Sequence, residues 1–69
     1  MPLLKMSVGA RRRIVEVAGD DAVRHRLGAL GFVEGMEVEV VAHVGGNFVV
    51  DVLGSRVAID KTVARRIRV

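Results

Sequence analysis

The chain has 69 residues, of which 51% are hydrophobic and 28% charged, a composition that suits one small folded domain over residues 1–69 and excludes a disordered tail. It contains no cysteine, which excludes disulfides, thiolate metal sites and cysteine nucleophiles. The net charge of +3 suits an acidic partner but is ordinary for a folded surface. Because only 3% of the residues are aromatic, the core must consist mainly of Val, Leu and Ile, which favour β-sheets.

No segment of the sequence resembles a membrane span or a secretion signal. The apolar runs fall far short of the roughly 20 residues that cross a bilayer, and residues 1–6 are too few for the apolar part of a signal peptide. The absence of cysteine is also typical of reducing compartments. We therefore expect a cytoplasmic protein without a membrane span of its own.

The first predicted element is a strand over residues 11–17, whose alternation is incomplete. Arg13, Val15 and Val17 share one face of it, and Ile14 lies on the other. Gly19 then breaks the strand and leads to a helix.

A short helix is predicted over residues 21–30, where Asp20 or Asp21 can cap the first free amides. The apolar residues that line one face of it at helical spacing are Val23, Leu27 and Leu30. Gly31 follows, at the position where a left-handed residue commonly ends a helix.

After the helix the apolar period changes to two, which predicts a meander of three strands. Met36, Val38 and Val40 alternate with glutamates in the first of these strands, and residues 45–47 form a hairpin loop. The inward residues of the second strand are Phe48, Val50 and Val52. A type II′ turn at Gly54–Ser55 then leads into the third strand.

The C-terminal residues predict one helical turn over residues 61–66 and a last strand in which Ile67 and Val69 close the core. Five short, twisted strands can close into a small barrel without exposed edges. We therefore predict a mostly β fold, a small SH3-like β-barrel of about five strands with one short α-helix after the first strand. The alternative is an OB-like barrel, which usually places its helix between the third and fourth strands.

The sequence contains no pattern typical of an active site. Ser7 and Ser55 lie in predicted turns without the strand-to-helix context of a nucleophile elbow. No glycine-rich loop precedes a helix, as it does in phosphate-binding sites. We therefore expect a protein that is not an enzyme.

A metal site has weak support in the sequence. His25 and His43 have no recognised ligand spacing, and no cysteine supplements them. The carboxylates that could join them are Glu39, Asp51 and Asp60. We expect no cofactor; ferrous iron is chemically compatible with such ligands but is not indicated by the sequence.

Two basic runs, at residues 11–13 and 65–68, leave a small nucleic-acid-binding barrel as an alternative function. Single-strand binding relies on aromatic stacking, and the only aromatic residues are Phe32 and Phe48. The same shortage disfavours recognition of proline-rich peptides, which needs an aromatic-lined groove. We therefore expect a solvated basic face and no nucleic-acid partner.

Residues 26–35, Arg-Leu-Gly-Ala-Leu-Gly-Phe-Val-Glu-Gly, resemble the Arg-Leu-x-x-Leu-Gly-Phe-x-x-Gly signature of the ferrous iron transport protein A family (FeoA). The similarity extends over nearly the whole chain, through the opening strand at 8–19, the strand at 36–41 and the closing part at 47–69. Gly28 departs from the pattern, because the family usually carries a larger residue at this helix position.

The resemblance implies an SH3-like barrel without catalytic activity. It also implies an accessory role in ferrous iron uptake, in which the domain binds or regulates the cytosolic GTPase part of the membrane transporter FeoB. The same domain occurs at the C-terminus of iron-dependent repressors, so a metal-responsive regulatory module is a further alternative.

The signature points to a short corner between two glycine turns as the partner-binding surface. The partner-binding residues that we predict there are Arg24, Arg26, Leu30, Gly31, Phe32, Val33, Gly35 and Met36. Two interpretations of Phe32 stay open, because its ring can face the partner or fold back onto the apolar stripe of the helix. Weak self-association through the same corner is also open.

Overall fold

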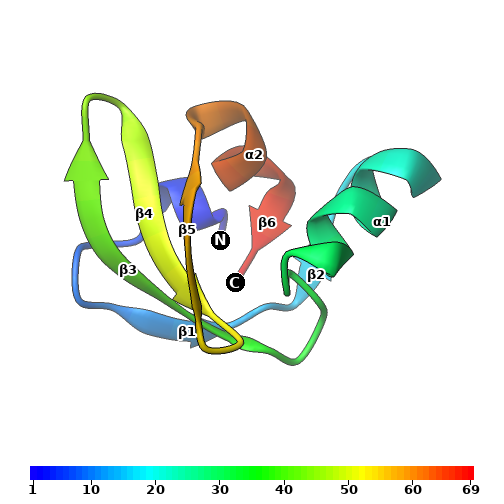
Figure 1. Cartoon of the computed structure of the whole chain (residues 1–69), viewed down its shortest axis with the longest axis horizontal. Helices are drawn as coiled ribbons and strands as arrows, with labels where there is room; N and C mark the ends of the chain where they lie inside the picture. The colour runs from blue at the N-terminus through cyan, green and yellow to red at the C-terminus, as the bar shows by residue number, and fades with distance from the viewer.

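The computed structural model describes residues 1–69 and contains two antiparallel sheets with the strand orders β1-β3-β4-β5 and β2-β6 (Figure 1). Its elements in chain order are the 3-10 turn η1 (Leu3–Lys5), β1 (Arg11–Arg13), β2 (Glu16–Val17), α1 (Asp21–Ala29), β3 (Glu37–Val44), β4 (Asn47–Val52), β5 (Ser55–Ile59), α2 (Lys61–Arg66) and β6 (Ile67–Arg68). The predicted mostly β fold, with a short helix before a three-strand meander, is confirmed. Neither α-helix has the length and apolar character needed to cross a membrane.

The prediction of one continuous first strand is wrong, because β1 and β2 belong to different sheets. The N–H of Ile14 donates to the carbonyl oxygen of Met36 at 2.8 Å, whereas that of Val15 donates to Arg68 at 2.8 Å. The chain therefore changes its hydrogen-bonding partner between these two residues. The change breaks the predicted alternation, since Ile14 and Val17 are buried and Val15 is 65% exposed.

Helix α1 begins as predicted, at a capping aspartate. The Asp20 carboxylate accepts a hydrogen bond of 2.9 Å from the N–H of Val23, which satisfies one of the free amides at the helix start. The predicted apolar stripe is only partly correct: Leu27 is buried, Val23 is half-buried and Leu30 is 45% exposed. Leu30 is exposed because the helix ends at Ala29, and Leu30 is the C-cap residue.

Strands β3, β4 and β5 form the predicted meander. Its buried side chains are Val38, Val40, Phe48, Val50, Val52 and Ile59. The register shifts between Val40 and Ala42, and such a bulge bends a strand and increases its twist. Met36 does not belong to the strand as predicted, because β3 begins at Glu37, and Met36 lies in the preceding turn with 38% exposure.

The turn between β4 and β5 falls one residue earlier than predicted. Val52 pairs with Ser55, so the turn residues are Leu53 and Gly54. Their φ angles of 53° and 75° are both positive, as a type I′ turn requires and a type II′ turn does not. A leucine in this left-handed conformation costs about 1–2 kcal/mol relative to ordinary backbone.

The C-terminal segment folds as predicted. Helix α2 is capped by the Asp60 carboxylate, which accepts a hydrogen bond of 2.9 Å from the N–H of Val63. The chain then enters β6, and Ile67 and Val69 are both buried.

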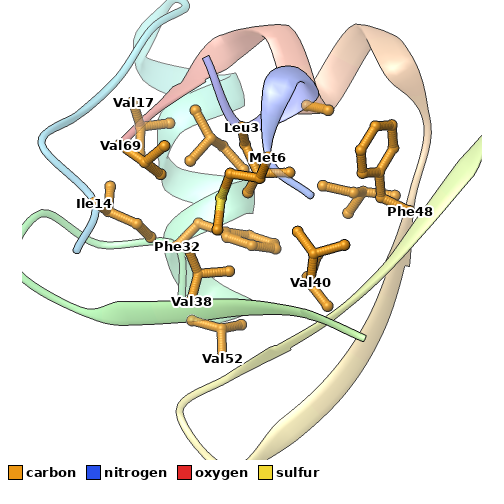
Figure 2. Close-up of a cluster of buried hydrophobic side chains, with 14 of the residues drawn as sticks. Leu3, Met6, Ile14, Val17, Phe32, Val38, Val40, Phe48, Val52 and Val69 are labelled. Carbon is orange, nitrogen blue, oxygen red and sulfur yellow. The ribbon is translucent and has the colours of Figure 1, made fainter. Parts of the chain in front are cut away.

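The N-terminal segment is part of the folded core, although no element was predicted for it. The N–H of Val69 donates to the carbonyl oxygen of Met1 at 2.7 Å, so the two ends of the chain lie side by side (Figure 1). The core of 15 buried residues consists of Leu3, Met6, Ile14, Val17, Leu27, Phe32, Val38, Val40, Phe48, Val50, Val52, Ile59, Ala64, Ile67 and Val69. Figure 2 shows that the η1 region covers one side of this cluster.

Because Leu3 is fully buried, its truncation should destabilise the whole domain. We expect Leu3→Ala to lower the free energy of unfolding by about 2–5 kcal/mol, measured by urea denaturation. Lys5→Ala changes an exposed residue of the same turn and is the matched control, with an expected effect within about 0.5 kcal/mol. Equal unfolding midpoints for Leu3→Ala and the unmodified chain would show that this segment is not part of the cooperative core.

Candidate functional site

The corner after α1 is fixed by two backbone hydrogen bonds. The N–H of Gly31 donates to the carbonyl oxygen of Gly28 at 3.0 Å, and that of Phe32 donates to Leu27 at 3.1 Å. This pair of bonds is a Schellman motif, which requires a left-handed residue just after the helix. Gly31 fills that position with a φ of 105°, so the predicted end of the helix is confirmed.

Gly31 is also required by a close approach of the β4–β5 turn. A Cβ atom on Gly31 would lie 3.2 Å from the Cβ of Leu53 and 3.4 Å from a methyl group of Val52. The first distance is shorter than ordinary van der Waals contact. The end of the helix and the tip of the hairpin are therefore packed directly on each other.

The prediction that Phe32 contacts a partner is wrong, because its side chain is 1% exposed. Figure 2 shows its ring inside the core, in the group that includes Met6, Val38 and Val40. The left-handed turn at Gly31 directs the next side chain back toward the helix stripe and the sheet, as in other Schellman motifs. Of the two interpretations, the folded-back ring is therefore the correct one.

Other apolar side chains near this turn are exposed, and we call them the apolar corner. They are Leu30, Val33, Met36 and Leu53. The first three belong to the segment predicted from the sequence, whereas Leu53 was missed. The signal that could have found it is an apolar residue before glycine at a hairpin turn, where Asn, Asp or Gly is the usual choice.

A second glycine turn keeps this segment rigid. The N–H of Met36 donates to the carbonyl oxygen of Val33 at 3.0 Å, and Gly35 between them has a φ of 87°. The N–H of Gly35 also donates to the carbonyl oxygen of Ile14 at 2.8 Å. This bond attaches the turn to the residue that follows the edge strand β1. The exposed side chains of the corner are therefore held on an ordered backbone.

The two arginines of the predicted site lie on α1 and are both exposed. The ion pairs of the structure join Arg11 to Glu39 and Arg56 to Asp51, so Arg24 and Arg26 have no carboxylate partner. Arg24 borders a hollow beside the helix, whereas Arg26 does not. The structure thus brings Arg24, but not Arg26, close to the corner residue Val33.

This hollow, the helix hollow, has a volume of about 270 Å³. Its lining residues are Val17, Arg24, Gly28, Phe32, Val33 and Glu34. A Cβ atom on Gly28 would meet no atom within 4 Å, so nothing in the chain packs against this side of the helix. Gly28 therefore opens the hollow instead of accommodating a neighbouring element.

A second hollow, of about 430 Å³, lies on the outer face of the four-stranded sheet between Met36 and Leu53. Two of its carboxylates accept hydrogen bonds from arginines. Glu39 accepts one of 3.0 Å from Arg11, and Asp51 accepts two, of 2.9 and 3.2 Å, from Arg56. The hydrogen bonds from Arg56 hold the pKa of Asp51 below its usual value. A general acid needs a raised pKa, so this carboxylate is suited to an ion pair and not to proton donation.

The histidines and carboxylates considered as metal ligands do not converge. No group of three or more His, Cys, Asp or Glu side chains in the chain could hold a metal ion. The His43 ring lies edge-on to Phe48, with a centroid distance of 4.3 Å. Asp60 caps α2, while Glu39 and Asp51 accept hydrogen bonds from arginines.

The family model described as "FeoA domain" matches residues 1–69 of the chain. None of the curated proteins compared with the chain matches it.

Among solved structures, the FeoA of Stenotrophomonas maltophilia in complex with zinc is 34% identical, with a TM-score of 0.84 over 99% of this chain and 87% of that one. It is described as a procaryotic SH3 domain protein and a candidate activating factor of ferrous iron transport. A crystal structure of an iron uptake regulatory protein (FeoA) is 31% identical, with a TM-score of 0.88 over 97% of this chain and 91% of that one. These similarities confirm the SH3-like fold predicted from the sequence.

A manganese-dependent transcriptional repressor contains the same fold. It is 16% identical, with a TM-score of 0.85 over 97% of this chain and 39% of the repressor. At this identity the likeness concerns the fold alone.

Because the Phe32 side chain is buried in the core, its removal should mainly lower the stability of the fold. We expect Phe32→Ala to lower the free energy of unfolding by about 3–5 kcal/mol in urea denaturation. Val33→Ala removes an exposed neighbour and should change it by less than about 0.5 kcal/mol. Similar losses for the two variants would contradict the packing of Phe32 described above.

The ion pair between Arg56 and Asp51 gives a pH-dependent prediction. We expect the pKa of the Asp51 carboxyl, measured by carbon NMR, to lie below 3.8 and to return toward 3.8 in Arg56→Gln. Since the folded-state pKa is lowered, the stability from this pair is present above the unfolded pKa and is lost as the pH falls through the folded pKa. Arg11→Gln is the control, because Arg11 pairs with Glu39; an unchanged Asp51 pKa in Arg56→Gln would refute the assigned cause.

Proposed function

Since the chain belongs to the FeoA domain family, which is associated with ferrous iron transport, we propose that it is a non-enzymatic accessory protein of ferrous iron uptake. It acts in the cytoplasm by binding the cytosolic GTPase part of the membrane transporter FeoB, and it requires no metal cofactor of its own. The partner contacts the apolar corner and the adjacent surface of α1.

The observation that carries this proposal is the exposure of four aliphatic side chains on a rigid backbone. Leu30 and Val33 are each 45% exposed, and Leu53 is 64% exposed beside them. Burial of one such side chain in an interface contributes up to about 1.5–3 kcal/mol, and an ordered backbone lowers the entropy lost on binding. A small apolar patch with a charged residue such as Arg24 at its edge is typical of a protein-binding surface.

The side-chain contacts of the chain favour binding over catalysis. Its side-chain hydrogen bonds are helix caps, arginine–carboxylate pairs and one arginine contact to backbone, and no hydroxyl group donates to a base. A nucleophilic serine or threonine needs such a base within hydrogen-bond reach.

The same contacts disfavour the nucleic-acid alternative. Phe32 and Phe48 are both buried, so neither can stack on a base. In the basic run of β1, Arg11 pairs with Glu39, and Arg13 donates to the carbonyl oxygen of Gly35 at 3.0 Å. Arg11 and Arg13 therefore already have partners within the protein, although the Arg11 side chain remains 65% exposed.

Calorimetric titration against the purified cytosolic domain of the transporter tests the proposal, in nucleotide-free, GDP-bound and GTP-analogue-bound states. We expect binding in at least one state. Val33→Asp and Leu53→Asp, which place a charge on the apolar corner, should each weaken it at least about tenfold.

The matched control is Val44→Asp, which makes the same change at an exposed residue at the far end of β3. This variant should bind like the unmodified chain. Absence of binding in every nucleotide state would refute the proposed partner, and equal weakening by all three aspartate variants would refute the proposed surface.

A further inference from the structure

Gly28 weakens α1 without any structural reason within the chain. Glycine in a helix interior costs about 1 kcal/mol relative to alanine. Gly28 is the next-to-last residue of α1 and is not among the glycines with a positive φ. An added Cβ atom would also meet nothing within 4 Å. Neither backbone conformation nor packing therefore explains why a glycine stands here.

The missing side chain leaves a hollow beside the helix whose inner end is formed by buried core residues. Val17 and Phe32 are core residues that border the helix hollow, and Val33 of the apolar corner forms part of its wall. The hollow measures about 270 Å³. A cavity of roughly 150 Å³ in another protein holds a benzene molecule, so this hollow is large enough for one aliphatic side chain. A larger residue at position 28 would project into this space.

The charges at the rim indicate which kind of molecule fits. Arg24 and Glu34 border the hollow, and neither forms an ion pair within the chain. A polypeptide can bring a carboxylate to Arg24 and a backbone N–H to Glu34 while one side chain fills the apolar space. A lipid tail offers no donor for Glu34, and a nucleic acid offers no aliphatic side chain.

We propose that the helix hollow receives one aliphatic side chain of the transporter's cytosolic domain, next to an acidic residue that pairs with Arg24. This inference rests on the proposed function and adds to it a second contact, in a hollow that is bordered by Val33 of the apolar corner but not by Met36 or Leu53. Gly28 is the residue that makes the hollow available.

The test separates folding from binding, because filling the hollow should affect them in opposite directions. Gly28→Ala should raise the melting temperature by about 4–8 °C, since it removes the helix penalty and meets no neighbour. Gly28→Leu should fill the hollow and weaken binding to the transporter's cytosolic domain at least about tenfold. Gly28→Ala fills it only in part and should weaken binding by about threefold.

The matched control is Ala22→Leu, which places the same leucine side chain at an exposed residue of α1 that does not border the hollow. It should leave binding unchanged. Arg24→Gln should weaken binding several-fold and reduce its dependence on salt concentration.

Each outcome has a distinct meaning. If the unmodified chain binds the cytosolic domain and both Gly28 variants bind it as tightly as the unmodified chain does, the inference is wrong and the proposed function stands. If the unmodified chain does not bind the cytosolic domain, both are wrong. Sedimentation of the chain alone distinguishes a second copy as the occupant: self-association that Gly28→Leu abolishes, with transporter binding unchanged, would overturn the inference.

Discussion

The contact between the end of α1 and the β4–β5 turn is the constraint on which the rest of the surface depends. Gly31 must adopt a φ of 105° to end the helix, and it must lack a side chain because Leu53 and Val52 approach it closely. Only glycine satisfies both conditions without strain. The position of the helix relative to the sheet, and the direction in which the chain continues, are both set at this residue.

This turn divides the signature segment into core and surface. Leu27 and Phe32 are joined by a backbone hydrogen bond across the turn and are both buried. Leu30, which precedes Gly31, and Val33, which follows Phe32, are exposed instead. The Leu-Gly-Phe spacing therefore serves packing, and the residues next to it are available for contacts. A phenylalanine in such a signature is thus a poor indicator of a binding site when a left-handed glycine precedes it.

Features set by neighbouring residues were predictable from the sequence, whereas features set by distant contacts were not. The cap at Asp20, the meander and the last helical turn follow from local hydrogen bonding and from the period of apolar residues. The break at Ile14 depends on hydrogen bonds to residues from two other parts of the chain. The roles of Leu3 and Leu53 likewise depend on the C-terminal strand and on the strand register, which no local pattern reveals.

Two residues, one in the apolar corner and one in the neighbouring helix, carry a free-energy cost that the fold does not require. Gly28 costs about 1 kcal/mol in the helix, and Leu53 costs about 1–2 kcal/mol in a left-handed turn. Small domains are stable by only about 5–15 kcal/mol, so the sum is a substantial share of the total. Unfavourable backbone conformations such as that of Leu53 cluster at functional sites. One of these residues opens a hollow and the other exposes a leucine, and both lie near the segment that contains Gly31 and Gly35. The surface around this segment is therefore where the sequence departs furthest from what folding alone would favour.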